Sequence, residues 1–230
     1  MTLLETLLQQ SPALIIAIPL FAAFLMPLVS RVHARLRNIF AVVMLSLTGC
    51  FIGLLATDVL AHGPRIYIFG GKDLTLPLVR ILFEVDAISI FMAIITIMLA
   101  IVAVIYSWSF MKEQDGLDKY YTLFLLLVTS ALGMELTGDL FNFFVFLEIS
   151  CIASCALIAF WIYEGEALEA AFKYIVISSV GALFVLFAIG IFYAQYNALN
   201  IATLANALQY TFLDKIVLVL LIVVTAISFA

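Results

Sequence analysis

Charged residues are scarce in this sequence. They make up 11% of its 230 residues, whereas 67% of the residues are hydrophobic. Soluble domains carry about 25% charged residues, because their surfaces must be hydrated. The formal net charge of -5 is distributed among the segments between apolar runs and includes no basic patch, which excludes a nucleic-acid-binding protein. The composition instead indicates an integral membrane protein surrounded by the lipid bilayer.

Cysteine and histidine are also rare, with three and two residues. Cys50, Cys151 and Cys155 lie in apolar runs and have the spacing of neither a disulfide framework nor a metal site. Cys151 and Cys155 share a helical stripe with Glu148, so a thiol-bound metal remains the alternative to the favoured interpretation as small packing residues. The sequence has no cysteine cluster, no glycine-rich nucleotide loop and no histidine within an apolar run, and it therefore predicts no cofactor, metal or catalytic residue.

Seven apolar runs are long enough to cross a bilayer as helices, for which about 20 residues suffice. Short polar segments separate these runs, and the strict alternation of a transmembrane β-barrel is missing. The sequence therefore predicts an all-α polytopic membrane protein with about seven transmembrane helices. The predicted spans are residues 13–29, 38–61, 85–110, 120–137, 139–163, 168–193 and 212–230.

Basic residues mark two of the segments between the spans. Arg31, Arg35 and Arg37 crowd the first such segment, and Lys112 and Lys119 lie in the third. Because loops rich in lysine and arginine stay in the cytoplasm, this pattern predicts a multi-pass protein of the plasma membrane with its N-terminus outside.

Two shorter elements are expected between the spans. Residues 66–76 alternate in hydrophobicity around Gly70 and Gly71, which predicts a small hairpin over the external face. Residues 200–208 have apolar side chains at helical spacing, which predicts a short helix at the membrane interface.

A carboxylate interrupts the fifth apolar run. Glu148 follows Asp139 by nine residues, so a rise of about 1.5 Å per residue places it roughly 14 Å into a hydrocarbon core about 30 Å thick. An acidic residue at that depth normally faces a bundle interior or water and marks an ion path. We therefore interpret Glu148 as an ion-translocation residue. The alternative is a neutral carboxyl group bound to neighbouring backbone or serine.

A lysine lies near the start of the sixth apolar run. Lys173 is four residues after Glu169 and, by the same helical rise, roughly 8 Å into the membrane from the cytoplasmic side. Measured from that side, Glu148 lies only about 8 Å deeper. The proton affinity of a buried lysine changes when a charge moves nearby, which is the chemistry that an ion relay needs. The alternative is a lysine that reaches the headgroups or pairs with Glu169. Ser178 and Ser179 are candidates to hold water along the path, although serines in such helices commonly serve packing.

Three motifs in this chain resemble one known family. They are residues 86–89 (DAIS), 136–148 (LTGDLFNFFVFLE) and 171–178 (AFKYIVIS), in this order. They are similar to the antiporter-like subunits shared by respiratory complex I, Mrp-type cation/proton antiporters and energy-converting membrane-bound hydrogenases. Residues 137–142 are more similar to the Mrp large subunit and the hydrogenase versions than to the proton-pumping subunits of bacterial complex I.

The resemblance implies a fold and a domain division. The fold is the start of an inverted-repeat antiporter-like architecture, in which repeats of five helices each contain a broken helix. Residues 1–110 correspond to three N-terminal helices with an external hairpin loop, and residues 111–230 to the first, incomplete repeat. The chain stops at Ala230 inside the expected seventh helix, and Lys215 is too near the start of that helix to be the partner lysine. We therefore expect further residues, or a separate subunit, to complete the bundle.

The resemblance also implies roles for individual residues. Glu148 matches the family's fifth-helix glutamate and Lys173 its sixth-helix lysine, whereas Glu135 and Asp139 lie at the external end as further candidates for the ion path. The implied function is translocation of H⁺, Na⁺ or both across the lipid bilayer within a redox-driven or Mrp-type complex. Other membrane subunits are the expected partners, and any oxidoreductase chemistry belongs to them. The alternatives are a structural subunit that anchors a complex and, less favoured, a free-standing solute carrier.

Overall fold

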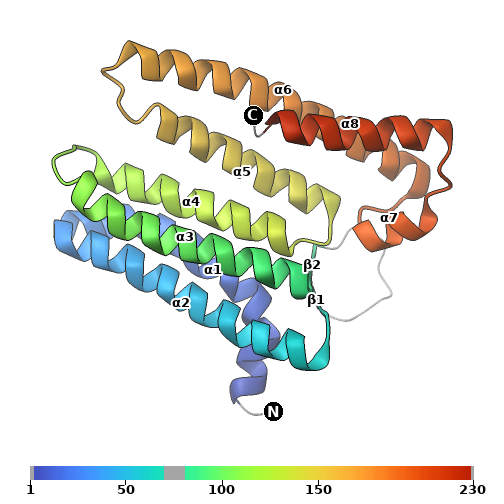
Figure 1. Ribbon diagram of the computed structural model, residues 1–230, viewed down its shortest axis with the longest axis horizontal. Coiled ribbons are helices and arrows are strands. Elements are labelled where there is room, and N and C mark those ends of the chain that lie inside the picture. Colours follow the sequence, from blue (N-terminus) through green and yellow to red (C-terminus); the bar gives the residue numbers. More distant parts are fainter. Residues whose placement is uncertain (1–2, 70–80, 229–230) are drawn as a thin grey trace. The chain divides into compact units, whose positions relative to one another are not determined.

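The computed structural model describes residues 3–69 and 81–228, which form eight helices and two short strands (Figure 1). In chain order these are α1 (Leu3–Val32), α2 (Ala34–His62), β1 (Arg65–Ile68), β2 (Leu82–Val85), α3 (Ala87–Phe110), α4 (Leu117–Leu136), α5 (Leu140–Ile158), α6 (Gly165–Tyr196), α7 (Ile201–Ala207) and α8 (Phe212–Ser228). Each predicted span coincides with one long helix. Among the described residues, five helices (α1, α2, α3, α5 and α6) are long and apolar enough to cross a membrane. The predicted all-α polytopic fold is confirmed, and the predicted number of about seven spans agrees roughly with these five.

The helices form two compact units. The first comprises residues 1–67 and 84–136 and contains α1 to α4. The second comprises residues 68–83 and 137–230 and contains α5 to α8. The sequence analysis divided the chain after residue 110, between three N-terminal helices and the first family repeat. These compact units do not test that division, and it stays a prediction.

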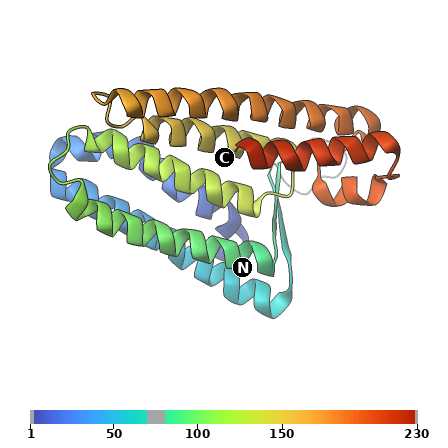
Figure 2. The same cartoon turned by 45° about the horizontal axis from the view of Figure 1, so that its top comes forward.

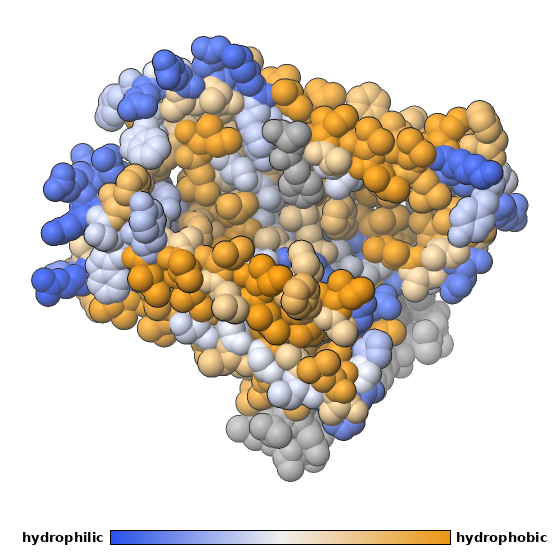
Figure 3. All heavy atoms as spheres, in the orientation of Figure 1, coloured by the Kyte–Doolittle hydropathy of each residue, from blue (hydrophilic) through white to orange (hydrophobic). Residues whose placement is uncertain are grey.

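In the first unit, α1 packs against α2 and α4, and α3 packs against the same two helices. Each helix buries one face, and the fully buried side chains are mostly aliphatic, among them Ile15, Met26, Leu45, Leu125 and Leu132. Many large apolar side chains on the opposite faces stay exposed, as expected for helices that contact lipid. Figure 3 shows hydrophobic residues along the helices and hydrophilic residues gathered near the helix ends.

In the second unit, α6 packs against both α5 and α8 (Figures 1 and 2). The four helices and the segment before α7 share one core of buried side chains: Leu140, Val185, Ala188, Ile189, Phe192, Leu199, Leu204, Val217 and Val224. The short helix predicted over residues 200–208 is confirmed as α7, and its position at the membrane interface stays a prediction.

The predicted hairpin is described only in part. Its first strand coincides with β1, which pairs with β2 in a two-stranded sheet. Gly70, Gly71 and the predicted second strand fall in residues 70–80, outside the described residues. β2 begins at Leu82, beyond these residues, so the turn at the two glycines stays a prediction.

α6 and α8 approach each other closely at Gly181. A Cβ atom at this position would overlap the Ser228 hydroxyl oxygen and lie 3.3 Å from the Ser228 Cβ. One turn earlier on α6, the Ser178 hydroxyl donates a hydrogen bond to the Ser228 carbonyl oxygen at 3.1 Å. The missing side chain at residue 181 therefore lets the last turn of α8 pack directly on α6, as small residues do between membrane helices.

We expect Gly181→Ala to destabilise the packing of α6 on α8 by about 1–3 kcal/mol, because the added methyl group overlaps the Ser228 hydroxyl. Thermal unfolding of the purified protein in detergent measures this change. Gly190→Ala is the matched control, since an added Cβ there meets nothing within 4 Å and alanine favours the helix. Adding Ser228→Gly to Gly181→Ala is expected to restore part of the stability. Equal unfolding temperatures for the two single alanine variants would contradict the close approach.

Candidate functional site

Two of the sequence motifs begin helices. Asp86 precedes α3, and its Oδ1 accepts hydrogen bonds from the Ser89 backbone N–H at 2.7 Å and the Ser89 hydroxyl at 2.8 Å. The bond from the Ser89 N–H lowers the pKa of Asp86, because it stabilises the charged carboxylate. Asp139 precedes α5 and accepts from the Asn142 backbone N–H at 2.9 Å. Both aspartates are N-caps that satisfy donors which the first helical turn leaves unpaired.

Asp139 also belongs to a turn that other segments hold in place. The neighbouring Gly138 N–H donates to the Leu82 carbonyl at 3.2 Å. The Gly138 carbonyl accepts from the Ile201 N–H at 2.9 Å and from the Asn200 side-chain amide at 3.1 Å. Asp139 itself is 3% exposed and forms a β-bridge with Asn200. These contacts anchor the start of α5, and a role of Asp139 in an ion path stays a prediction.

Glu148 lies near the middle of α5, about 12 Å along the helix from Leu140. Its side chain is half-buried. Among the described residues, no backbone or side-chain group forms a hydrogen bond or ion pair with its carboxylate. This carboxylate is therefore not tied to a fixed partner in the described part of the chain, and its role in an ion path stays a prediction.

The stripe of α5 that carries Glu148 faces α6. The Cys155 thiol donates a hydrogen bond to the Ala171 carbonyl of α6 at 3.5 Å. Cys151 is 4% exposed and lies within electrostatic range of Glu148. In the described part of the chain, no three histidine, cysteine, aspartate or glutamate side chains are placed to hold a metal ion. The geometry thus favours packing between helices as the role of the two thiols.

Lys173 lies on a different face of α6. Its ammonium group pairs with Glu169 one turn earlier, and the two side chains are 68% and 65% exposed. Ala171 and Ser178, by contrast, are buried where α6 contacts its neighbours. Successive helix residues are about 100° apart, so Lys173 projects about 200° away from Ala171. The structure therefore does not bring Lys173 together with Glu148, and it shows the surface ion pair that was the alternative interpretation of this lysine.

The remaining candidates lie in three different environments. Ser178 is 2% exposed and its hydroxyl is occupied by the bond to α8, whereas Ser179 is exposed. Glu135 belongs to α4 in the first unit, where the Thr96 hydroxyl of α3 donates to its Oε1 at 2.5 Å. The second oxygen of Glu135 is buried and has no hydrogen-bond partner among the described residues.

Known proteins similar to this chain belong to one family. Residues 137–229 match the family described as NADH:quinone oxidoreductase/Mrp antiporter, transmembrane. The chain is 31% identical over 219 residues to NADH-quinone oxidoreductase subunit N of Desulforudis audaxviator and 31% identical over 210 residues to a putative antiporter subunit, mnhD2, of Staphylococcus haemolyticus. A chain in the structure of the membrane-bound sulfane sulfur reductase, an archaeal respiratory membrane complex, superposes with a TM-score of 0.82 at 30% identity over 95% of this chain. The chain belongs to the antiporter-like subunit family.

The antiporter-like chain spans less than half the length of these relatives. The alignments cover 94% and 90% of this chain but 42% and 41% of the two curated proteins, and 44% of the sulfane sulfur reductase chain. The family prediction is confirmed. Relatives named for an oxidoreductase and for an antiporter match at the same identity, so the finer resemblance to the Mrp large subunit and the hydrogenase versions stays a prediction.

Asp214 is one of the buried carboxylates that the sequence analysis missed in this antiporter-like chain; Asp58, which pairs with Arg65, is another. Asp214, in the first turn of α8, is fully buried, and its Oδ2 accepts from the Tyr196 hydroxyl at 2.8 Å and the Thr211 N–H at 2.9 Å. The Asp214 N–H donates in turn to the Thr211 hydroxyl at 3.3 Å. This reciprocal pair is a capping box, and its Thr-x-x-Asp spacing is a signal that the sequence contains. The hydrogen bond from the Tyr196 hydroxyl to Asp214 joins the end of α6 to α8. No sequence motif predicts this bond.

We expect Asp139→Ala to lower the free energy of unfolding of the antiporter-like chain by about 1 kcal/mol, because the first turn of α5 loses its cap. Asp139→Asn is expected to stay close to the wild type, since asparagine also caps helices. Thermal unfolding in detergent measures both variants, and equal destabilisation would contradict the capping role. Ion uptake by the asparagine variant separately tests whether the charge of Asp139 serves an ion path.

Proposed function

We propose that this chain is an ion-translocating subunit of a multi-subunit membrane complex and moves H⁺, Na⁺ or both past Glu148. Family membership and five apolar helices support a multi-pass membrane subunit. The observation that carries the proposal is the state of Glu148: half-buried at mid-helix, on the stripe facing α6, and without a hydrogen-bond or ion-pair partner among the described residues. A carboxylate is costly at this depth, and intramembrane acids characteristically mark ion or proton pathways.

The names of the relatives support the kind of assembly. One is a subunit of NADH-quinone oxidoreductase, one is a putative antiporter subunit, and the structural neighbour belongs to an archaeal respiratory membrane complex. We infer that this chain likewise works beside other membrane subunits, which would carry any redox chemistry. The basic segments favour the plasma membrane with the N-terminus outside.

The proposed relay joins Glu148 to Lys173 through water or a rearranged helix. Lys173 does not contact Glu148 directly, because it projects from the face of α6 opposite to Ala171. Exposed Ser179 lies on a face between these two directions and offers a hydroxyl for a bridging water. The pair of Lys173 with Glu169 does not prevent exchange, since exposed ion pairs contribute only about 0–1 kcal/mol.

The competing function is a structural subunit that seals or anchors a complex. The surface pair of Lys173 and Glu169 favours it, because an exposed lysine near the start of a membrane helix commonly serves as an anchor at the headgroup level. A structural subunit tolerates neutral substitutions at Glu148 and Lys173, whereas an ion-translocating subunit does not.

We expect Glu148→Gln to lower ion uptake about tenfold or more while the complex still assembles, because glutamine keeps the side-chain shape and removes the ionisable group. Proton and sodium uptake into vesicles that contain the native complex measures the effect. Glu166→Gln is the control, since this carboxylate is exposed in the first turn of α6. Wild-type uptake by Glu148→Gln would favour the structural subunit.

For Lys173, we expect alanine to slow ion uptake more than arginine, with both variants assembling normally. Arginine keeps the positive charge but does not readily release its proton, so it should support part of the transport. Glu169→Gln controls for the surface ion pair, because it breaks the same pair and leaves the lysine in place. Equal, wild-type rates for the alanine and arginine variants would make Lys173 an interfacial anchor and remove it from the relay.

A further inference from the structure

A carboxyl group of the first unit lies where the end of α4 meets the interior of α3. Glu135 is one residue before the end of α4, and its Oε1 accepts a hydrogen bond from the Thr96 hydroxyl of α3 at 2.5 Å. Thr96 is about 14 Å along α3 from Ala87, and α3 is apolar and long enough to cross a membrane. The contact therefore places an ionisable group beside the inner part of a spanning helix, where a charge is costly.

The two oxygens of this carboxyl group share one hydrogen-bond donor in the described part of the chain. Oε2 of Glu135 is buried and has no hydrogen-bond partner there. An ionised carboxylate has about four acceptor sites, and a buried charge in a protein is normally paired or bound to several donors. A single threonine hydroxyl does not meet this requirement.

The helices that pack against α4 bring no positive charge to Glu135. α3 has no charged residue, and α1 has none between residues 6 and 30. The first turns of α2 and α4 hold the basic residues Arg35, Arg37 and Lys119. Arg37 packs over the Tyr121 ring, which is about 21 Å from Glu135 along α4. These three cations are therefore at the opposite end of α4.

The charged groups near the other end of α2 are engaged with one another. Asp58 binds both His62 and Arg65 of β1, and its atoms lie 2.9 Å and 2.6 Å from theirs. The neighbouring strand β2 contributes Glu84, which is a further acid. Among the described residues, no cation is thus available to pair with Glu135.

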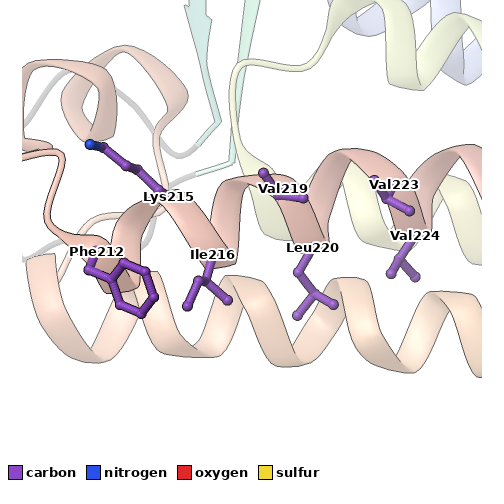
Figure 4. Close-up of a pocket in the computed structure, with 7 residues that line it drawn as sticks. All are labelled: Phe212, Lys215, Ile216, Val219, Leu220, Val223 and Val224. Atoms are coloured by element: carbon purple, nitrogen blue, oxygen red, sulfur yellow. The ribbon is translucent and has the colours of Figure 1, made fainter.

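The unpaired oxygen of Glu135 is enclosed by the protein itself. Because Oε2 is buried, a side chain from another protein segment cannot reach it while α3 and α4 keep their packing. The apolar groove that has Lys215 at one end differs in this respect, since α8 alone lines it and its outer side is open (Figure 4). The Glu135 site can therefore hold only a very small group.

Oxygen ligands for a metal cation are scarce around Glu135. A cavity of about 250 Å³ runs between α3 and α4 from Thr96 toward Phe124, and its remaining lining side chains are leucine, alanine and valine. A bound Na⁺ ion needs several oxygen atoms in place of its hydration shell. A proton needs one carboxyl oxygen and removes the charge.

We propose that Glu135 is a proton-binding site, in which Oε2 holds a proton at neutral pH and Oε1 accepts the hydrogen bond from Thr96. The proton converts a buried carboxylate into a neutral carboxyl group, whose unpaired hydroxyl is far less costly than an unpaired charge. The site lies in the first unit and is separate from Glu148 in the second. A bound proton is a property of the resting protein, so this site stands independently of the ion translocation proposed above.

Infrared difference spectroscopy of the full-length protein in detergent tests for the bound proton. We expect the spectrum of the wild type minus that of Glu135→Gln at neutral pH to contain the C=O stretching band of a neutral carboxyl group, which shifts in D₂O. Glu113→Gln is the matched control, since this exposed glutamate should contribute only carboxylate bands.

Thr96→Val leaves Glu135 in place and therefore reads the same group without replacing it. We expect the neutral carboxyl band to move to higher frequency and keep its intensity, because Oε1 loses a hydrogen bond while the proton stays bound. This shift remains measurable if Glu135→Gln does not fold.

Thermal unfolding at several pH values gives a second readout. At neutral pH the folded protein keeps the proton of Glu135 and the unfolded chain releases it, so a rise in pH above the ordinary titration range of glutamate destabilises the wild type. We expect the unfolding temperature of Glu135→Gln to rise relative to the wild type between acidic and neutral pH. Glu113→Gln should show no such trend.

The opposite outcomes would overturn the assignment. Absence of the neutral carboxyl band, or a Glu135→Gln variant that loses stability relative to the wild type as the pH rises to neutrality, would show an ionised carboxylate with a cationic partner. Disappearance of the band when Na⁺ replaces K⁺ in the buffer would show a sodium site. Neither result bears on uptake past Glu148.

Discussion

The hydrocarbon core of a bilayer offers no water to backbone amide and carbonyl groups, and this constraint governs most of the structure. An unpaired backbone group there costs several kcal/mol, so the chain crosses as helices. Only the helix ends leave donors and acceptors without partners. The polar residues of this apolar chain are concentrated at those ends, where Asp86, Asp139, Asn200 and Thr211 accept hydrogen bonds from the first turns of α3, α5, α7 and α8.

The same polar residues also join segments that are distant in sequence. Asn200 starts α7 and binds the carbonyl of Gly138 just before α5. Asp214 starts α8 and accepts a hydrogen bond from Tyr196 at the end of α6. One end of the second unit is thereby held by specific hydrogen bonds, while the helices along its length pack through small and apolar side chains.

Within this framework Glu148 is the exception, and exceptions to a consistent structural pattern are expected at functional sites. Its carboxylate lies at mid-helix, far from the helix ends where Asp139 and Asp214 accept hydrogen bonds from backbone N–H groups. Lys173 and Lys215, the described lysines of this unit, differ in a similar way. Lys173 has a partner on its own helix, whereas Lys215 has none among the described residues and stands at the end of an apolar groove.

The sequence by itself determined the class of protein, the positions of the long helices, the mid-helix position of Glu148 and the family, because run length, charge content and ordered motifs are local properties. Only the tertiary structure decided the orientation of Lys173, the close approach at Gly181, the partner of β1 and the burial of Asp214. The physical reason is that a membrane helix is apolar both where it meets protein and where it meets lipid. Hydrophobic periodicity then carries little information about which face is buried, and that choice is made by packing between helices.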